Sequence, residues 1–260
     1  MEERVLLNTL DDGVRTLTLN RPDRRNALSG ELVRALMEAF TDVRGDAETR
    51  VVVLTGSGDR SFCSGADLNP MAAAGGPLAM HEERRTFVRL LQAMRACGRP
   101  VIARVGGHVA AGGMGLLVAC DLAVAADDVH FSTPEVNVGL FPMMIMTLIR
   151  RLIGPRRTLE LLLTAQRLPA KTAAEWGLVN HAVPRGELDT SVNDLARRLA
   201  GLSPAVLRLG RDAFYRMEDM TVDDALEYLC GQLTLNTLTE DAAEGVMAFV
   251  QKRAPEWKGR

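Results

Sequence analysis

Two glycine-bearing segments contain the residue types that could hold a developing negative charge on backbone N–H groups. The first runs from Ser61 to Leu68 and the second from Gly106 to Gly115, and each follows a predicted strand and opens a predicted helix. The first turn of a helix presents N–H groups without intrahelical partners at the positive end of the helix dipole. Two such turns could form an oxyanion hole. The alternative is that the glycines only permit tight turns and close packing; neither segment has the spacing of a Rossmann or P-loop phosphate site.

Glu135 carries a carboxylate, a group that can transfer protons in catalysis. Its surroundings, Thr133-Pro134-Glu135, also fit an ordinary helix start, with an N-cap threonine, a proline at the first helical position and an acid in the first turn. Both interpretations stay open at this point. Asp67 and Asp121 are interpreted as structural residues that cap local turns, and His108 as a packed or solvent-facing side chain.

Composition excludes several classes of protein. The four cysteines and four histidines are scattered, without a CxxC pair or two ligands at helical spacing, which argues against a disulfide scaffold and against a metal site. A net charge of −2 and the lack of a basic, aromatic-rich run argue against nucleic acid as a partner. The chain shows no export signal and no apolar run of about 20 residues, so we expect a cytoplasmic protein without a membrane contact.

The elements that must position these groups begin with a hairpin. Val5–Leu10 and Val14–Asn20 alternate apolar and polar residues around Asp11-Asp12-Gly13, which is typical of two antiparallel strands. Ser29 is a candidate N-cap for an amphipathic helix, and Val51–Leu54 is an uninterrupted apolar run of strand length.

Helix and strand patterns then alternate. Leu78–Ala96 and Gly112–Cys120 have helical patterns, whereas Val101–Val105 and Leu122–Ala125 have strand patterns. This alternation predicts an α/β fold in which helices pack on a mostly parallel sheet.

From about Met143 onward the periodicity is helical, except at Val179–Val183. Three amphipathic stretches close the chain, near Pro204–Met217, Val222–Leu235 and Asp241–Lys252. We therefore divide the 260 residues into a β/α core, 1–200, and a helical region, 201–260, that packs against a neighbouring subunit.

Four motifs follow one another in order: Asn20-Arg21-Pro22-Asp23-Arg24-Arg25-Asn26-Ala27-Leu28, Phe62-Cys63-Ser64-Gly65-Ala66-Asp67-Leu68, Ala111-Gly112-Gly113 through Ala119-Cys120-Asp121, and Thr133-Pro134-Glu135 through Gly139-Leu140. The tail contains Phe249-Val250-Gln251-Lys252-Arg253-Ala254-Pro255. In order and spacing, from about Val14 to the end, the chain closely resembles the crotonase (enoyl-CoA hydratase/isomerase) superfamily.

The resemblance implies a spiral of β-β-α units with a C-terminal helical region that mediates trimerisation, often as a dimer of trimers. It also implies that the thioester oxygen of an acyl-CoA accepts hydrogen bonds from the Ala66 and Gly112 N–H groups, with Glu135 as the proton-transfer residue. No separate cofactor is implied, because coenzyme A enters as part of the substrate. The residues that the resemblance assigns to substrate or coenzyme A are Arg24, Arg25, Ala27, Leu28, Gly65, Asp67, Leu68, Gly113, Pro134 and, from a neighbouring subunit, Lys252.

The chain departs from the family pattern in the acid/base residues. Two-glutamate hydratases have one glutamate at the position of Glu135 and another on the helix after the second oxyanion turn, where this chain has Gly115. Phe141–Thr147, which includes Met143–Met146, is bulky and apolar where many hydratases have glycines. We expect this stretch to make the pocket drier, which raises the pKa of a nearby carboxylic acid.

Two further positions concern coenzyme A and pocket access. Asn69 stands where many relatives have lysine, which puts a phosphate contact there in doubt. Met71–Met80, rich in alanine and glycine, is predicted to be a mobile segment over the pocket that orders on ligand binding, or else a plain surface loop.

These residues predict an enzyme that acts on an unsaturated acyl-CoA thioester, by hydration or by double-bond isomerisation. The single glutamate favours isomerisation. Two alternatives stay open: another oxyanion-hole reaction, such as thioester hydrolysis or decarboxylation, and a catalytically silent acyl-CoA-binding protein.

Overall fold

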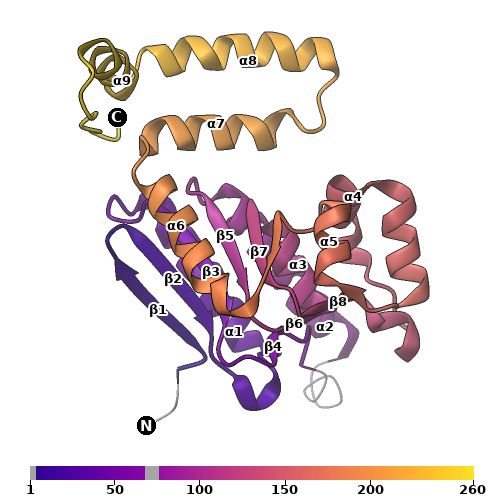
Figure 1. The fold of residues 1–260 in the computed structure, drawn as a ribbon. Helices are drawn as coiled ribbons and strands as arrows, with labels where there is room; N and C mark the ends of the chain where they lie inside the picture. Colours follow the sequence, from indigo (N-terminus) through magenta and orange to yellow (C-terminus); the bar gives the residue numbers. More distant parts are fainter. Residues whose placement is uncertain (1–3, 68–75) are drawn as a thin grey trace.

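A computed structural model describes residues 4–67 and 76–260 (Figure 1). Among them, six strands form the larger sheet, in the order β1-β2-β3-β5-β7-β10. The strands are β1 (Leu6–Asp11), β2 (Val14–Leu19), β3 (Val51–Gly56), β5 (Val101–Val105), β7 (Leu122–Ala126) and β10 (His181–Val183). The predicted hairpin is confirmed, since β1 pairs antiparallel with β2, and the remaining neighbours pair in parallel.

A second sheet was missed by the sequence analysis. It contains β4 (Ser61–Cys63), β6 (His108–Ala110), β8 (His130–Ser132) and β9 (Leu168–Pro169) in this order, with β9 antiparallel to β8 and the other neighbours parallel. Strands of two or three residues are too short to show alternation. Both glycine-bearing segments therefore contain a strand. Residues 64–67 are not helical, and the prediction that the first segment opens a helix depends on residues 68–75, which lie outside the described residues.

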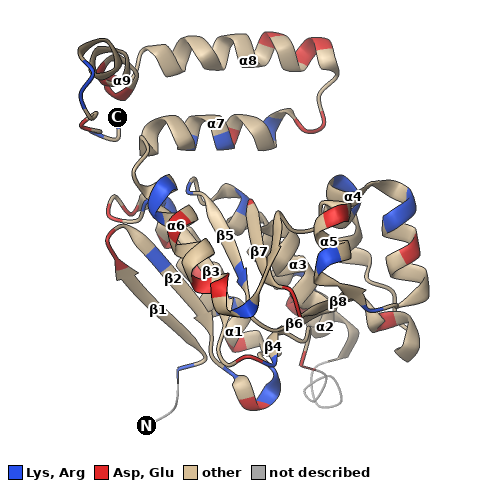
Figure 2. Ribbon diagram, viewed as in Figure 1, with Lys and Arg blue, Asp and Glu red and all other residues tan. Residues whose placement is uncertain are grey.

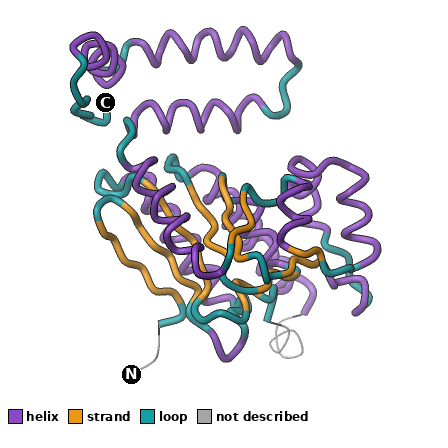
Figure 3. The backbone as a smooth tube through the Cα atoms, in the orientation of Figure 1, coloured by secondary structure: helices purple, strands orange, loops and turns teal. Residues whose placement is uncertain are grey.

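Helices pack on the larger sheet and on each other (Figure 3). They include α1 (Gly30–Gly45), α2 (Gly76–Ala96), α3 (Gly112–Ala119) and α6 (Leu188–Ala200). The predicted cap of α1 is confirmed, because the Ser29 hydroxyl accepts the Leu32 N–H at 3.2 Å. Helix α6 packs on β2, β3, β5 and β7, while α2 packs on both α1 and α3.

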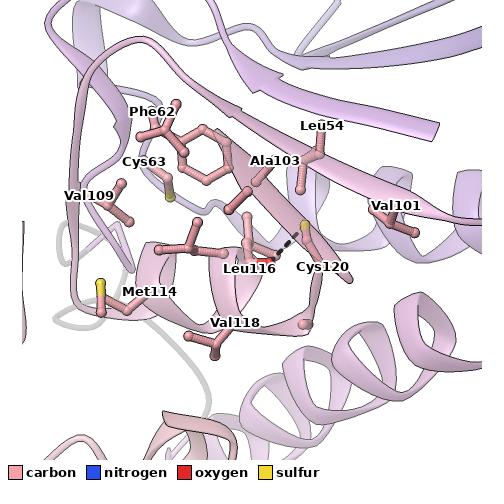
Figure 4. Close-up of a cluster of buried hydrophobic side chains, with 14 of the residues drawn as sticks. Leu54, Phe62, Cys63, Val101, Ala103, Val109, Met114, Leu116, Val118 and Cys120 are labelled. Atoms are coloured by element: carbon pink, nitrogen blue, oxygen red, sulfur yellow. Dashed lines mark hydrogen bonds between the residues drawn. The ribbon is translucent and has the colours of Figure 1, made fainter. Parts of the chain in front are cut away.

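Helix α3 is apolar on all sides and forms part of the core. Figure 4 shows Met114, Leu116 and Val118 of this helix in one cluster with Leu54 of β3 and Phe62 of β4. A helix that is apolar all round must be enclosed by protein. This enclosure fixes the position of Gly112, the residue at which α3 begins.

The segment after β8 is mainly helical. It contains η3 (Pro134–Val138), α4 (Met143–Thr164), α5 (Ala170–Trp176) and η4 (Arg185–Glu187), and η1 (Pro22–Arg24) is a similar short helix near the N-terminus. Helix α4 is interrupted at Gly154, which is followed by Pro155. Within residues 4–67 and 76–260, no helix has the length and apolar character needed to span a membrane.

Three helices close the chain: α7 (Pro204–Met217), α8 (Val222–Thr237) and α9 (Glu240–Gln251). The predicted helical stretches are thus confirmed to within two residues. Figure 1 shows α7 and α8 stacked beside the sheet region, with α9 across one end of the pair. The functional division into residues 1–200 and 201–260 stays a prediction.

Arg211 attaches α7 to the core. Its Nε lies 2.8 Å from Asp121 Oδ2, and its terminal nitrogens donate to the carbonyls of Arg95 (2.6 Å) and Met94 (2.9 Å). The Tyr215 hydroxyl also donates to Asp121. The prediction that Asp121 caps a local turn is wrong, since its partners include an arginine and a tyrosine of α7, far away in the sequence.

Candidate active site

The ends of three adjacent parallel strands bring the candidate site together. β4 leads to Gly65-Ala66, β6 leads to Ala111-Gly112, and β8 leads to Glu135. The strands pair in the order β4-β6-β8, so their carboxyl ends lie next to one another. In open α/β sheets, ligands bind where strands end in this way.

The two predicted donors of the oxyanion hole lie close together. A Cβ built on Gly112 would be 3.7 Å from the Ala66 nitrogen and 3.6 Å from Gly65 Cα. Neither the Ala66 nor the Gly112 N–H donates a hydrogen bond to another described residue. Ala66 is exposed and Gly112 is half-buried, so a ligand can reach both groups. Two neighbouring N–H groups without a partner are what an oxyanion would need.

Ala111 holds a backbone conformation that few residues adopt. Its φ is 49° and its ψ is −125°, outside the regions open to an L-residue at low energy. Such strain costs on the order of 1–3 kcal/mol and is found mainly where function needs it. Because Ala111 immediately precedes Gly112, this conformation fixes the direction in which the Gly112 N–H points.

The loop from Arg24 to Leu28 supports the first donor. Leu28 and Ala66 form an isolated parallel bridge, in which the Leu28 N–H donates to Gly65 (2.8 Å) and the Asp67 N–H donates to Leu28 (3.0 Å). Ala27 and Leu28 are buried, whereas Arg24 and Arg25 are exposed. The two arginines are therefore accessible to a ligand beside the hole.

Asn26 is a positioning residue that the sequence analysis did not single out. It is fully buried with φ 54°, and its Nδ2 donates to the carbonyls of Ser57 (3.0 Å) and Ser61 (2.7 Å). Its Oδ1 accepts the Arg21 N–H at 3.0 Å. Asparagine tolerates a left-handed conformation better than most residues, which is the only signal that the sequence offered.

Asp67 forms an ion pair with a residue distant in the sequence. Its carboxylate lies 2.9 Å from Arg21 Nη2, and both side chains are mostly buried. The contact joins the end of the first segment to the supporting loop, and the capping of a local turn by Asp67 stays a prediction. Leu68 and Asn69, and the first part of the predicted mobile segment up to residue 75, lie outside the described residues.

Glu135 carries a carboxyl oxygen in an unusual environment. Its Oε2 is buried and has no hydrogen-bond partner among the described residues. Burial raises the pKa of this carboxyl above its ordinary value. Glu135 follows Ser132 by three positions, and the Ser132 carbonyl accepts the Ala111 N–H at 3.1 Å, so the acid and the second donor share one corner of the sheet.

The helix-start interpretation of Thr133-Pro134-Glu135 is only partly right. Pro134 does open the short helix η3, but Thr133 makes no capping hydrogen bond and instead donates its hydroxyl to the carbonyl of Leu161, at 3.0 Å. Thr133 thus ties the end of β8 to α4. An unpartnered buried oxygen on Glu135 is not needed to start a helix and is costly to keep.

Gly115 has no room for a side chain. A Cβ built there would lie 2.7 Å from Ile145 Cγ2 and 3.0 Å from Phe87 Cζ. The position that holds a second glutamate in two-glutamate hydratases is therefore filled from α4 and α2. The sequence analysis identified the missing glutamate but not the two residues that take its place.

The residues of the 143–146 stretch differ in exposure. Met143, Met144 and Met146 are exposed, whereas Ile145 is buried. Helical periodicity explains this difference, because Ile145 shares a face with Ile149, one turn further along α4. The drying of the pocket that we expect from the whole stretch stays a prediction.

His108 and Lys252 lie apart from the hole. His108 is exposed on β6, and its Nδ1 accepts the His130 N–H at 3.1 Å. Lys252 ends α9 in the helical region (Figure 1). A contact of Lys252 with coenzyme A would have to come through a neighbouring subunit, and it stays a prediction, as do the assigned contacts of Gly113 and Pro134.

The cysteine, histidine and acidic side chains do not form a metal centre in the described part of the chain. Within the described ranges, 4–67 and 76–260, no three His, Cys, Asp or Glu side chains are grouped so that they could hold a metal ion. Cys63, Cys97 and Cys120 are buried, and Cys230 is exposed. Burial raises the pKa of the Cys63 thiol to about 12, so it is not a ready nucleophile.

Three features define a crotonase-type protein. They are neighbouring N–H groups after β4 and β6, a desolvated carboxyl group after β8, and a helical C-terminal region. A family model described as "Enoyl-CoA hydratase/isomerase" matches residues 9–260, and the chain belongs to this family. The crystal structure of an enoyl-CoA hydratase from Mycobacterium smegmatis has a TM-score of 0.95 and 36% identity, and the match covers 98% of this chain and 99% of that one.

Two curated relatives bear different names. The mitochondrial enoyl-CoA hydratase domain-containing protein 3 of Rattus norvegicus is 33% identical over 257 residues, or 98% of this chain and 85% of that protein. A carnitinyl-CoA dehydratase of Salmonella typhi is 33% identical over 249 residues, or 94% of each chain.

Proposed function

We propose that this protein is an acyl-CoA enzyme that moves a double bond along the acyl chain, converting a 3-enoyl-CoA into the conjugated 2-enoyl-CoA. The observation that carries the proposal is the Glu135 carboxyl, whose Oε2 has no partner among the described residues. It follows β8, the strand that pairs with the one leading to Gly112, while position 115 offers no second acidic side chain. No cofactor enters the proposed reaction.

In the proposed reaction Glu135 takes a proton from the carbon next to the thioester, and the electron pair of that C–H bond passes into a dienolate. The Ala66 and Gly112 N–H groups donate to the dienolate oxygen, a stabilisation of about 3–4 kcal/mol for each donor. The protonated Glu135 then gives the proton to the fourth carbon. The double bond shifts by one position, and the carboxylate is restored.

Coenzyme A is proposed to lie along the loop at Arg24 and Arg25, which are exposed next to the hole. Ala27, Leu28, Gly65 and Gly113 would contribute close backbone contacts. Leu68 is assigned to the same site by resemblance alone.

Turnover assays test the reaction. The purified protein is given a 3-enoyl-CoA or a 2-trans-enoyl-CoA, while the conjugated thioester absorbance and product mass are followed. Isomerisation produces conjugation at unchanged mass.

Glu135→Gln should lower turnover by about 10²–10⁴-fold while coenzyme A binding is retained. Exposed Glu38 offers a matched control, because Glu38→Gln removes the same charge from the outer face of α1. Full activity of Glu135→Gln would remove this residue from the mechanism.

Hydration is the second candidate, favoured by the names of the relatives. Loss of conjugation from the 2-enoyl-CoA with a gain of one water would establish it. If neither compound is turned over, thioester hydrolysis, decarboxylation or a silent acyl-CoA-binding role becomes the favoured function. Turnover of a panel of acyl-CoAs and a binding assay distinguish these three.

We also propose that the protein is a homo-oligomer, a trimer or a dimer of trimers. Support comes from the large apolar side chains exposed on the last two helices, which include Leu233, Leu235, Val246 and Phe249. Figure 2 shows that charged residues on α8 are confined to its beginning. Monomeric proteins rarely leave a contiguous apolar surface of this kind open to water.

A further inference from the structure

Gly115 lies one helical turn beyond Gly112 on α3, so both positions share a face of that helix. Side chains on a helix point back toward its N-terminus. A side chain at position 115 would therefore extend toward the Gly112 N–H. The atoms that occupy this space are Ile145 Cγ2 and Phe87 Cζ, 2.7 Å and 3.0 Å from where the Cβ would be.

Both occupants are held firmly. Ile145 is 3% exposed and Phe87 is 8% exposed. They come from different helices, α4 and α2, which both pack against α3. Helix α4 also packs against η3, which carries Glu135. The two side chains thus form an apolar wall beside α3, and one of them, Ile145, comes from the helix that also packs against the short helix carrying Glu135.

We infer that Phe87 and Ile145 are specificity-determining residues, which fill the place of a second acid/base group and of the water that it would hold, and so direct the reaction to proton transfer between carbons. This inference rests on the proposed isomerase function. An apolar wall offers no hydrogen bond to hold an attacking water, because a bound water needs two or more polar partners. Glu135 is left to exchange its proton with the substrate.

The main test is the product ratio of an enlarged site. Ile145→Ala should raise the ratio of hydrated to isomerised product at least tenfold. Gly115→Glu alone should fail to fold or lose activity, because its Cβ meets Ile145, whereas Gly115→Glu combined with Ile145→Ala should fold and raise the ratio further. Ile149→Ala is the matched control: it removes the same atoms from a buried position one turn along α4 and should leave the ratio unchanged.

An unchanged ratio in folded Ile145→Ala and in the folded double variant would overturn the inference while leaving the isomerase proposal intact. A wild-type protein that hydrates 2-enoyl-CoA as its main reaction would overturn both. If Ile145→Ala does not fold, the milder Phe87→Leu takes its place with the same expected direction.

A wild-type protein that is inert toward both compounds would contradict the proposed function but not this inference. In that case the inference is tested by a measurement that does not depend on turnover. Glu135→Gln should raise the denaturation midpoint at neutral pH in the wild-type background. In the Ile145→Ala background this gain should fall by at least half, because water reaches the carboxylate. An equal gain in both backgrounds would show that the wall does not control water access.

Discussion

Glu135 is kept in a place that disfavours its charge. Because burial raises its pKa, the folded protein binds this proton more tightly than the unfolded chain does. The stability that comes from the protonated form is fully present below the ordinary value of 4.5 and is lost as the pH rises through the higher value of the folded state. At neutral pH the ionised carboxylate therefore costs stability.

Glu135→Gln should thus be more stable than the wild type at pH 7, and the difference should close as the pH falls toward 4.5. Urea unfolding of both proteins across this range measures it. Glu38→Gln should show no such trend. A wild-type protein as stable as the variant at every pH would mean that the buried carboxyl has a partner in solution.

Gly65 is the residue on which the geometry of the hole depends most directly. Its φ is 96°, and an added Cβ would lie 2.6 Å from Ala111 Cβ and 3.0 Å from the Gly112 nitrogen. Gly65→Ala should push the two donors apart and lower turnover at least about 10²-fold, the usual loss for one oxyanion donor. Steady-state kinetics measures this, with circular dichroism to verify folding. Near wild-type turnover would show that these N–H groups do not hold the reacting oxygen.

At the residue scale, the sequence predicted site residues whose type is unusual for their surroundings. It did not predict residues whose role depends only on packing contacts. Gly65 and Glu135 stood out because a glycine turn and an isolated acid are visible in a string of letters. Phe87 and Ile145 did not, because each is an ordinary apolar residue of a helix, and only the packing of α2 and α4 on α3 gives them a shared role.

At the scale of elements, Arg211 joins the helical region to the core. Its side chain is 8% exposed, and that of its partner Asp121 is 18% exposed. Removing one member of a buried pair leaves the other charge uncompensated, at a cost of about 3–5 kcal/mol. Arg211→Met should lower the free energy of unfolding by about that amount, measured in urea.

The exposed pair Arg44–Asp212, at 3.5 Å, supplies the contrast. Arg44→Met should cost less than about 1 kcal/mol. Adding Asp121→Asn to Arg211→Met should recover part of the loss. If Arg211→Met and Arg44→Met cost the same, the buried pair does not fasten α7.

The helices of twelve residues or more were predicted well, because their periodicity extends over three turns or more. The strands β4, β6 and β8 were missed, although they carry the site. Each has three residues, and its pairing depends on neighbours about twenty to fifty positions away, which no local pattern records.

For the whole molecule, the apolar surface of α8 and α9 predicts self-association. Phe249 is 86% exposed, so Phe249→Asp should leave the fold of one chain intact while it shifts the assembly toward monomers. Sedimentation velocity measures the change. Leu78→Asp, at an apolar position on α2 that is 77% exposed, should keep the wild-type state. A monomeric wild type would contradict the oligomer proposal.

The lack of a partner for the Glu135 oxygen also has an isotopic consequence. A carboxyl group whose Oε2 is buried and has no polar protein group beside it, among the described residues, should exchange its proton with the solvent slowly between the two halves of a reaction. For isomerisation in D₂O, most product molecules should therefore retain the hydrogen that the substrate brought, transferred from one carbon to the other. Mass spectrometry of the product measures this retention, and deuterium in nearly every molecule would mean that the carboxyl exchanges freely with bulk solvent.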